Sequence, residues 1–172
     1  MTEYYPLVRN HFITGAGGTG KSHTVQQIYN IWSTHLKPQE FAICATTGCA
    51  AVLLNCKAKT FHSWSGIGHG NKTATELLMH IQTKKYLYWR WKRVKYLLID
   101  EVSMMSPIMF TKLNYVAKAI RNNPHPFGGI KLVLVGDFCQ LPPVERTNDK
   151  DAPLFLFQTD AWKECNMKIH NL

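Results

Sequence analysis

The feature that most constrains the fold is a glycine-rich octapeptide, GAGGTGKS, which lies between an apolar run and a segment of helical character. Four of the six residues from Gly15 to Gly20 are glycine, and glycine inside regular structure costs about 0.5–1 kcal/mol relative to alanine. The pattern G-x-x-x-x-G-K-[ST] allows backbone N–H groups at a helix N-terminus to surround a phosphate. A glycine-rich turn that binds nothing is the alternative, but the flanking strand and helix patterns favour a phosphate-binding loop.

Short apolar runs alternate with longer helical segments along the chain. Strands are predicted at 11–14, 41–46, 96–99 and 131–135, and helices at 22–35, 49–54, 75–83 and 107–121. Apolar strands separated by helices indicate a mainly parallel sheet with helices on both faces. A length of 172 residues suits one domain with a real core. We therefore predict a single α/β domain over residues 1–172.

Two acidic residues end one of the apolar runs, in the sequence YLLIDE. A phosphate-binding loop needs a carboxylate on a neighbouring strand to hold Mg²⁺. We expect Lys21 to reach the β- and γ-phosphates of a nucleoside triphosphate, and Ser22 and Asp100 to hold Mg²⁺, Asp100 through water. Glu101 would orient and deprotonate the attacking water. Acid pairs also occur at strand ends for solvation alone, so the phosphate-binding loop is what favours the catalytic interpretation.

A third polar cluster follows the strand at 131–135, in the sequence GDFCQLPPV. Ligand sites in parallel sheets lie beyond the carboxyl ends of the strands, so Gln140 is predicted to sense the γ-phosphate. A proline-terminated loop without a ligand is the alternative. The predicted catalytic residues are Lys21, Glu101 and Gln140. The predicted ATP contacts are Gly15, Ala16, Gly17, Gly18, Thr19, Gly20, Lys21, Ser22, His23, Asp137 and Gln140, with His23 on the helix surface.

The net charge indicates the kind of partner that the chain binds, and the cysteine content indicates the cellular compartment. Twenty Lys and Arg against eleven Asp and Glu give a net charge of +9, which indicates an anionic partner such as nucleic acid. The five cysteines are odd in number and form no C-x-x-C pair, which favours reduced thiols over a disulfide framework or a zinc site. Because the sequence shows no signal peptide and no run of about 18 apolar residues, we expect a soluble intracellular protein without a membrane partner.

Five motifs occur together in the order and spacing of one known family. They are GAGGTGKS (15–22), ATTGCAA (45–51), TFHSWSGIG (60–68), LLIDEVSMM (97–105) and PFGGIKLVLVGDFCQLPPV (126–144). The chain thus resembles the PIF-one group of superfamily-one DNA helicases, which are related to RecD. The resemblance implies a three-layer RecA-like P-loop NTPase domain, with ATP and Mg²⁺ as cofactors. It further implies an ATP-driven 5′→3′ DNA helicase acting in replication, repair or recombination.

The resemblance also implies a track for single-stranded DNA. The implied DNA contacts are Thr46, Thr47, Gly48, Thr60, His62 and Ser63. Small polar residues and backbone amides suit phosphates, and flat side chains suit bases. Within TFHSW we expect His62 to contact DNA, whereas Phe61 and Trp64 are expected to pack in the core.

The chain departs from the family pattern in two respects. Residues 1–11 contain no glutamine of the kind that reads adenine in the family, which leaves the base preference open. The family continues into a second RecA-like domain that brings an arginine finger, so such a domain or subunit is an expected partner. We expect slow hydrolysis and no unwinding from this chain alone. The compartment expected for such a helicase is the nucleus of a eukaryote or host, with the mitochondrion or cytoplasm as alternatives.

The sequence also allows two alternative functions and a second candidate surface for nucleic acid. A nucleotide-binding module that recruits a partner without turnover is one rival, and an unrelated P-loop ATPase or kinase is the other. The stretch 84–95 holds six basic and four aromatic residues, which could grip nucleic acid by charge and stacking. We favour a helix whose aromatic residues cover the sheet while Lys84 and Lys85 face water.

Overall fold

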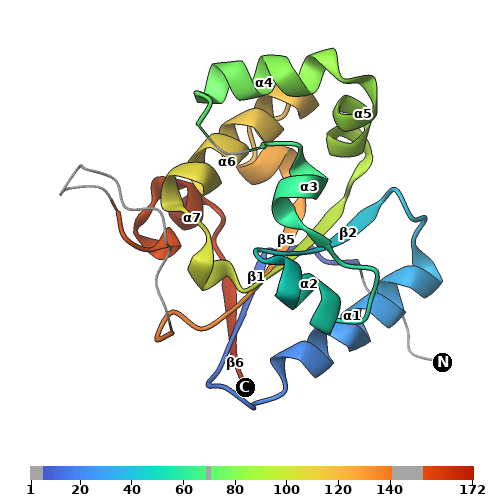
Figure 1. The fold of residues 1–172 in the computed structure, drawn as a ribbon, viewed down its shortest axis with the longest axis vertical. Coiled ribbons are helices and arrows are strands. Elements are labelled where there is room, and N and C mark those ends of the chain that lie inside the picture. The colour runs from blue at the N-terminus through green and yellow to red at the C-terminus, as the bar shows by residue number, and fades with distance from the viewer. Residues whose placement is uncertain (1–5, 69–70, 141–152) are drawn as a thin grey trace.

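The described part of the chain is built on a parallel sheet of six strands in the order β3-β2-β4-β5-β1-β6 (Figure 1). The structure, a computed structural model, describes residues 6–68, 71–140 and 153–172. The strands are β1 (His11–Thr14), β2 (Phe41–Ala45), β3 (Lys59–Thr60), β4 (Tyr96–Asp100), β5 (Lys131–Val135) and β6 (Lys168–Asn171). Every neighbouring pair runs parallel, which confirms the predicted α/β class.

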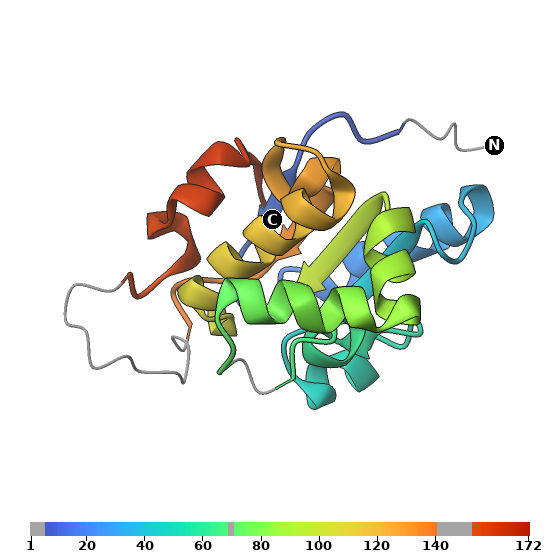
Figure 2. The ribbon, with the colours of Figure 1, turned by 90° about the horizontal axis from the view of Figure 1, so that it is seen from above.

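Helices cover both faces of the sheet (Figures 1 and 2). They are α1 (Lys21–His35), α2 (Gly48–Leu53), α3 (Phe61–Ser65), α4 (Ala74–Thr83), α5 (Lys85–Arg93), α6 (Pro107–Arg121) and α7 (Asp160–Glu164). Short 3₁₀ helices span Val102–Met104, Pro126–Gly129 and Leu156–Gln158. One buried cluster joins the sheet to α1 and α2, and a larger one joins it to α3 through α7. The two clusters give the three-layer arrangement that the sequence predicts.

The alternation of side chains along each strand supplies both clusters. In β4, Leu97 and Ile99 belong to the cluster under α3–α7, whereas Leu98 belongs to the cluster under α1 and α2. Successive strand residues point to opposite faces of a sheet. All three side chains are fully buried, so β4 reads as a continuous apolar run because both of its faces are covered.

Local signals fix where the longer helices begin. The Thr73 hydroxyl accepts from the backbone N–H of Glu76, whose carboxylate accepts from the N–H of Thr73, and this capping box starts α4. Ser106 caps α6, and Pro107 occupies its first turn. Helix α6 has the predicted bounds, 107–121. The helices predicted at 22–35, 49–54 and 75–83 each begin in the structure one residue earlier than predicted.

Four of the described strands and α-helices were not predicted from the sequence, and each lacks a strong local pattern. The strand β3 has two residues, and α3 and α7 have five each. The strand β6 (KIHN) has no apolar run, because its side chains are largely exposed while its backbone pairs with β1. The short 3₁₀ helix Pro126–Gly129, which follows α6, buries Phe127 completely.

Within the stretch 84–95, the predicted helix is present as α5 (Lys85–Arg93), but its aromatic residues divide between two environments. Trp91 is fully buried, whereas Tyr86 is 61% and Trp89 is 42% exposed. The expectation that the aromatic residues cover the sheet is therefore wrong for Tyr86 and Trp89. At helical spacing these two side chains lie on a different face of α5 from Leu87 and Trp91, which reach the core.

In the part of the chain that the structure describes, no helix is long and apolar enough to cross a bilayer.

Candidate nucleotide-binding site

The glycine-rich loop connects the end of β1 to the start of α1. Gly18 and Gly20 have φ angles of +83° and +97°, a region that side chains with a Cβ rarely adopt, so glycine is required at both positions. Gly20 is the N-cap residue of α1. The exposed segment Ala16–Gly20 therefore presents its backbone at the N-terminus of a 15-residue helix, where the dipole favours an anion.

Lys21 folds back over this loop. Its ammonium group donates to the carbonyl oxygens of Gly15 at 2.6 Å and of Ala16 at 2.9 Å. Ser22 is exposed on the first turn of α1 beside it. His23 is also exposed, and its Nε2 lies 3.0 Å from the amide nitrogen of Gln27, one turn along the helix. Lys21 thus contacts the phosphate-binding loop, Ser22 lies exposed on the first helical turn after it, and His23 lies along the helix surface.

Asp100 is the last residue of β4 and is only 6% exposed. Burial raises the pKa of its carboxyl group from the ordinary 3.8 to about 6, although the N–H of Glu101 and the charge of Lys21 act in the opposite direction. The N–H of Glu101 donates to Oδ1 of Asp100 at 2.9 Å. A bound cation would favour the ionised form of this carboxyl group, so Asp100 fits the predicted role of a magnesium ligand, with Ser22 as the second protein ligand.

Glu101 has a strained backbone and ties two strands together. Its φ and ψ angles of 56° and 41° lie in the left-handed region, which is uncommon for residues other than glycine and often marks a functional site. The carbonyl oxygen of Glu101 accepts from the Thr46 hydroxyl at 3.0 Å, and the N–H of Thr46 donates to the carbonyl of Asp100 at 3.2 Å. The start of the ATTGCAA motif after β2 is therefore fixed to the acidic pair after β4.

The loop after β5 forms a third side of the site. The N–H of Gly136 donates to the carbonyl of Ile13 in β1 at 3.1 Å. A Cβ at Gly136 would lie 3.1 Å from the backbone nitrogen of Val102, so the loop packs closely against the segment that follows Glu101. Asp137 stabilises a turn, accepting from the N–H groups of Cys139 and Gln140. Gln140 is exposed, and residues 141–144 of the motif lie outside the described residues.

The two segments expected to line the DNA track lie side by side. The hydroxyl groups of Thr47 and Thr60 cap α2 and α3, each accepting from a backbone N–H at 3.2 Å. A Cβ at Gly48 would lie 4.0 Å from the methyl group of Thr60. Gly48, His62 and Ser63 are exposed. The structure thus places these residues on one surface and uses both capping threonines to shape it.

The two aromatic residues of TFHSW pack in the core, and a residue of α5 holds the helix that carries them. Phe61 and Trp64 are 1% and 5% exposed, which confirms that they belong to the core. Arg90 of α5 donates to the carbonyl oxygens of Ser63 and Trp64 and so holds α3 in place. This role of Arg90 was not predicted from the sequence, because 26 or 27 residues separate the partners and no local pattern signals the contact.

The fold and the site together define a class of protein. A glycine-rich loop after β1, an acidic pair at the end of β4 and a polar turn after β5 meet at the carboxyl edge of one parallel sheet with helices on both faces. This is the arrangement of a RecA-like P-loop nucleotide-binding domain. A sequence model described as PIF1-like helicase matches residues 6–171. The chain therefore belongs to the PIF1-like helicase family, as the resemblance of its motifs implies.

Individual relatives agree with this assignment. The ATP-dependent DNA helicase RRM3 of Saccharomyces cerevisiae is 45% identical over 159 residues, which cover 92% of this chain and 22% of that protein. The crystal structure of the Pif1 helicase from Candida albicans superimposes with a TM-score of 0.85 at 38% identity, covering 95% of this chain and 36% of that one. A Bacteroides Pif1 crystal structure bound to ssDNA gives 0.75 at 26% identity, covering 96% and 38% of the two chains. The chain thus spans well under half the length of these relatives.

Proposed function

We propose that this chain is the first RecA-like motor domain of an ATP-dependent 5′→3′ DNA helicase, and that it binds Mg-ATP and single-stranded DNA. The observation that carries the proposal is the link between Thr46 and the acidic pair. It joins the predicted hydrolytic residue, Glu101, to the segment expected to bind DNA. Relatives named as ATP-dependent DNA helicases, and one solved with ssDNA, support both halves of the assignment.

The residues at the carboxyl edge of the sheet have complementary roles in this proposal. Lys21, whose ammonium group now binds two loop carbonyls, would turn to the β- and γ-phosphates. Glu101 would accept a proton from the attacking water, and Gln140 would contact the γ-phosphate from the β5 side. Mg²⁺ held by Ser22 and Asp100 would neutralise charge on the phosphate oxygens.

Thr46 gives a physical route for coupling the two sites. Two hydrogen bonds fix its backbone and hydroxyl to the carbonyls of Asp100 and Glu101. A shift of the acidic pair around a bound nucleotide would therefore move Thr46, and with it Thr47 and Gly48. Coupling of this kind requires an element whose arrangement both sites bias, and the Thr46 segment is bonded to the acidic pair and forms part of the proposed DNA track.

A second RecA-like domain or subunit completes the proposed motor, because an arginine finger is worth about 10³–10⁵ in rate for related NTPases. In a eukaryotic cell the proposed place of action is the nucleus, with the mitochondrion as the alternative.

The test is ATP hydrolysis with and without a single-stranded oligonucleotide, for wild type and Glu101→Gln. We expect slow hydrolysis that DNA accelerates in wild type, and loss of hydrolysis with retained ATP binding in Glu101→Gln. ATP binding without turnover in both proteins, with no DNA binding, would favour the module that recruits a partner. Turnover that is indifferent to DNA would contradict the proposed coupling between the nucleotide site and the DNA track.

A further inference from the structure

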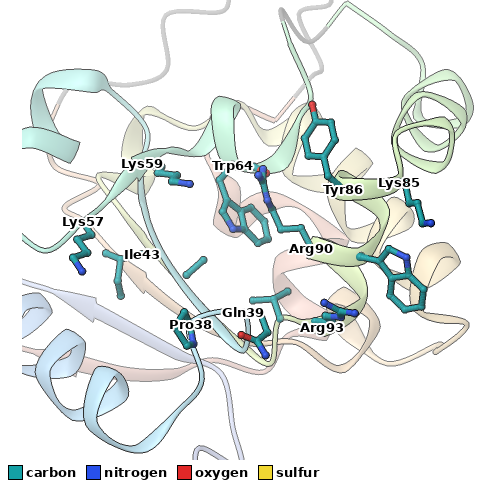
Figure 3. A pocket seen from close by; sticks show the side chains of 13 residues that line it. Pro38, Gln39, Ile43, Lys57, Lys59, Trp64, Lys85, Tyr86, Arg90 and Arg93 are labelled. Carbon is teal, nitrogen blue, oxygen red and sulfur yellow. The ribbon is translucent and has the colours of Figure 1, made fainter.

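A groove of about 750 Å³ lies between α5 and the β2–β3 edge of the sheet (Figure 3). We call it the basic groove, because its lining includes the cationic residues Lys57, Lys59, Lys85, Arg90 and Arg93. Figure 3 shows Lys57 and Lys59 on one side and the residues of α5 on the other. None of the described residues that line it is acidic. The nearby carboxylate of Glu40 is bound at 2.7 Å to Lys95, which does not line the groove.

The floor of the basic groove is a sheet edge. Ala42 and Ile43 both line it, although they belong to the clusters on opposite faces of the sheet. Strand β2 pairs with β4 from Phe41 onward, but with β3 only through Cys44 and Ala45. Among the described residues, the first half of β2 therefore has no strand beside it on the groove side.

Two exposed aromatic rings on α5 line the groove next to its arginines. Arg90 lies over the ring of Tyr86 at 5.7 Å from its centroid, and Arg93 lies over the ring of Trp89 at 5.1 Å. Residues three and four apart on a helix share one face, so the two pairs form one stripe along α5. Tyr86 and Trp89 are 61% and 42% exposed, which leaves aromatic surface available for stacking.

The basic groove is continuous with the segment expected to bind DNA. Lys59 directly precedes Thr60, and Trp64 of α3 lines the groove itself. Arg90 joins the two regions, because its guanidinium group donates to the carbonyls of Ser63 and Trp64. A polyanion that leaves the surface of His62 and Ser63 can therefore follow a line of positive charge along Lys59 and Lys57.

We propose that the basic groove is a second binding site for single-stranded nucleic acid, in which phosphates contact Lys57 and Lys59 and unpaired bases stack on Trp89 and Tyr86. The proposal extends the single-strand track of the proposed function and rests on it. Five cations without a carboxylate fit a phosphate backbone. Exposed aromatic rings favour a single strand over a duplex, because only unpaired bases offer free faces for stacking.

The experiment is fluorescence anisotropy of a labelled oligothymidine of about 15 nucleotides, near the upper site size of single-strand-binding folds, across a salt series. We expect Trp89→Ala to weaken binding about 10-fold without changing the salt slope, because stacking releases no counterion. Trp89→Phe, which keeps a ring, should retain most of the affinity. Lys57→Ala/Lys59→Ala should flatten the slope by about 0.7 for each lost phosphate contact.

Matched controls lie away from the groove. Tyr115→Ala removes an exposed ring on α6, and Lys168→Ala removes an exposed charge on β6, so neither should alter affinity beyond the general charge effect. His62→Ala reports the proposed track separately. If His62→Ala weakens binding while the groove variants match their controls, the second site is refuted and the proposed function stands.

Three further outcomes decide the assignment. Weakened binding in the groove variants with a silent His62→Ala would support the groove and move the track to it. Equal losses for a duplex of the same length would overturn the stacking of unpaired bases. A polyglutamate peptide that displaces the oligonucleotide from wild type, but binds Lys57→Ala/Lys59→Ala poorly, would assign the groove to an acidic protein partner and overturn the proposal.

Discussion

At the scale of single residues, the buried position of Asp100 makes the ionised form of its carboxyl group unfavourable. Its carboxyl group ends a fully buried strand, and burial raises its pKa from the ordinary 3.8 to about 6. Because the pKa is higher in the folded chain than in the unfolded chain, the neutral form contributes stability below pH 3.8, and that contribution is lost as the pH rises through about 6. At neutral pH the folded domain therefore holds a buried carboxylate at some expense of stability.

Asp100→Asn should stabilise the domain at pH 8 when EDTA is present and nucleotide is absent. A difference of about two pKa units corresponds to about 3 kcal/mol in the free energy of unfolding, and we expect this gain to approach zero below about pH 4. Urea unfolding of both proteins from pH 4 to pH 8 measures it. A variant that is less stable than wild type at pH 8 would show that ionised Asp100 is not disfavoured in the fold.

Thr46 is the second residue whose role follows from its contacts. Thr46→Val removes the hydroxyl that donates to Glu101 and should cost about 1 kcal/mol of stability. We expect it to reduce the change in single-strand affinity that a non-hydrolysable ATP analogue causes. Thr46→Ser, which keeps the hydroxyl, should retain that change. Anisotropy titrations with and without the analogue compare the three proteins, and an unchanged nucleotide effect in Thr46→Val would show that the coupling runs elsewhere.

At the scale of elements, Arg121 joins three segments behind the site. From the end of α6 its guanidinium group donates to the carbonyl of Gly128 and to the carbonyls of Trp91, Lys92 and Val94 at the end of α5. Burial lowers the pKa of this arginine, yet four carbonyl acceptors compensate its charge. The planar, multiply donating guanidinium group suits this position, whereas a lysine offers one point of charge.

Arg121→Met should lower the free energy of unfolding by at least about 3 kcal/mol, because it leaves several carbonyls without donors. Arg121→Lys should recover less than half of the loss. The matched control is Arg9→Met, an exposed arginine, which should stay within about 0.5 kcal/mol of wild type. Urea denaturation compares the four proteins, and equal midpoints for Arg121→Met and wild type would refute the role of Arg121.

Elements with a strong local pattern could be predicted from the sequence, and those held by distant partners could not. The helix at 107–121 shows its cap, its proline and its apolar periodicity in its own sequence. The strand β6 instead depends on pairing with β1, which lies far away in the sequence. The paired residues His11 and Lys168, for example, are 157 positions apart. The aromatic residues of α5 looked alike in the sequence, because composition does not say which face of a helix meets the core.

At the scale of the whole molecule, the strand order assembles the site. The order β4-β5-β1 brings the loop after β1 next to the turn at Asp137 and near the acidic pair after β4. The sequence predicts a parallel sheet and the chemistry at each strand end, but not this order, which depends on contacts between distant segments. For the same reason the sequence identifies Thr46 and Glu101 separately, whereas their hydrogen bond spans 55 residues.

Calorimetric titration of Mg-ATP into wild type and Lys21→Ala tests whether this edge of the sheet is an ATP site. We expect wild type to bind one equivalent and Lys21→Ala to show no measurable binding, because the phosphates lose the one cation that the loop supplies. Circular dichroism should give the same spectrum for both proteins, since the side-chain hydrogen bonds of Lys21 among the described residues go to two carbonyls of the loop itself. Equal affinity for Mg-ATP in the two folded proteins would contradict the account.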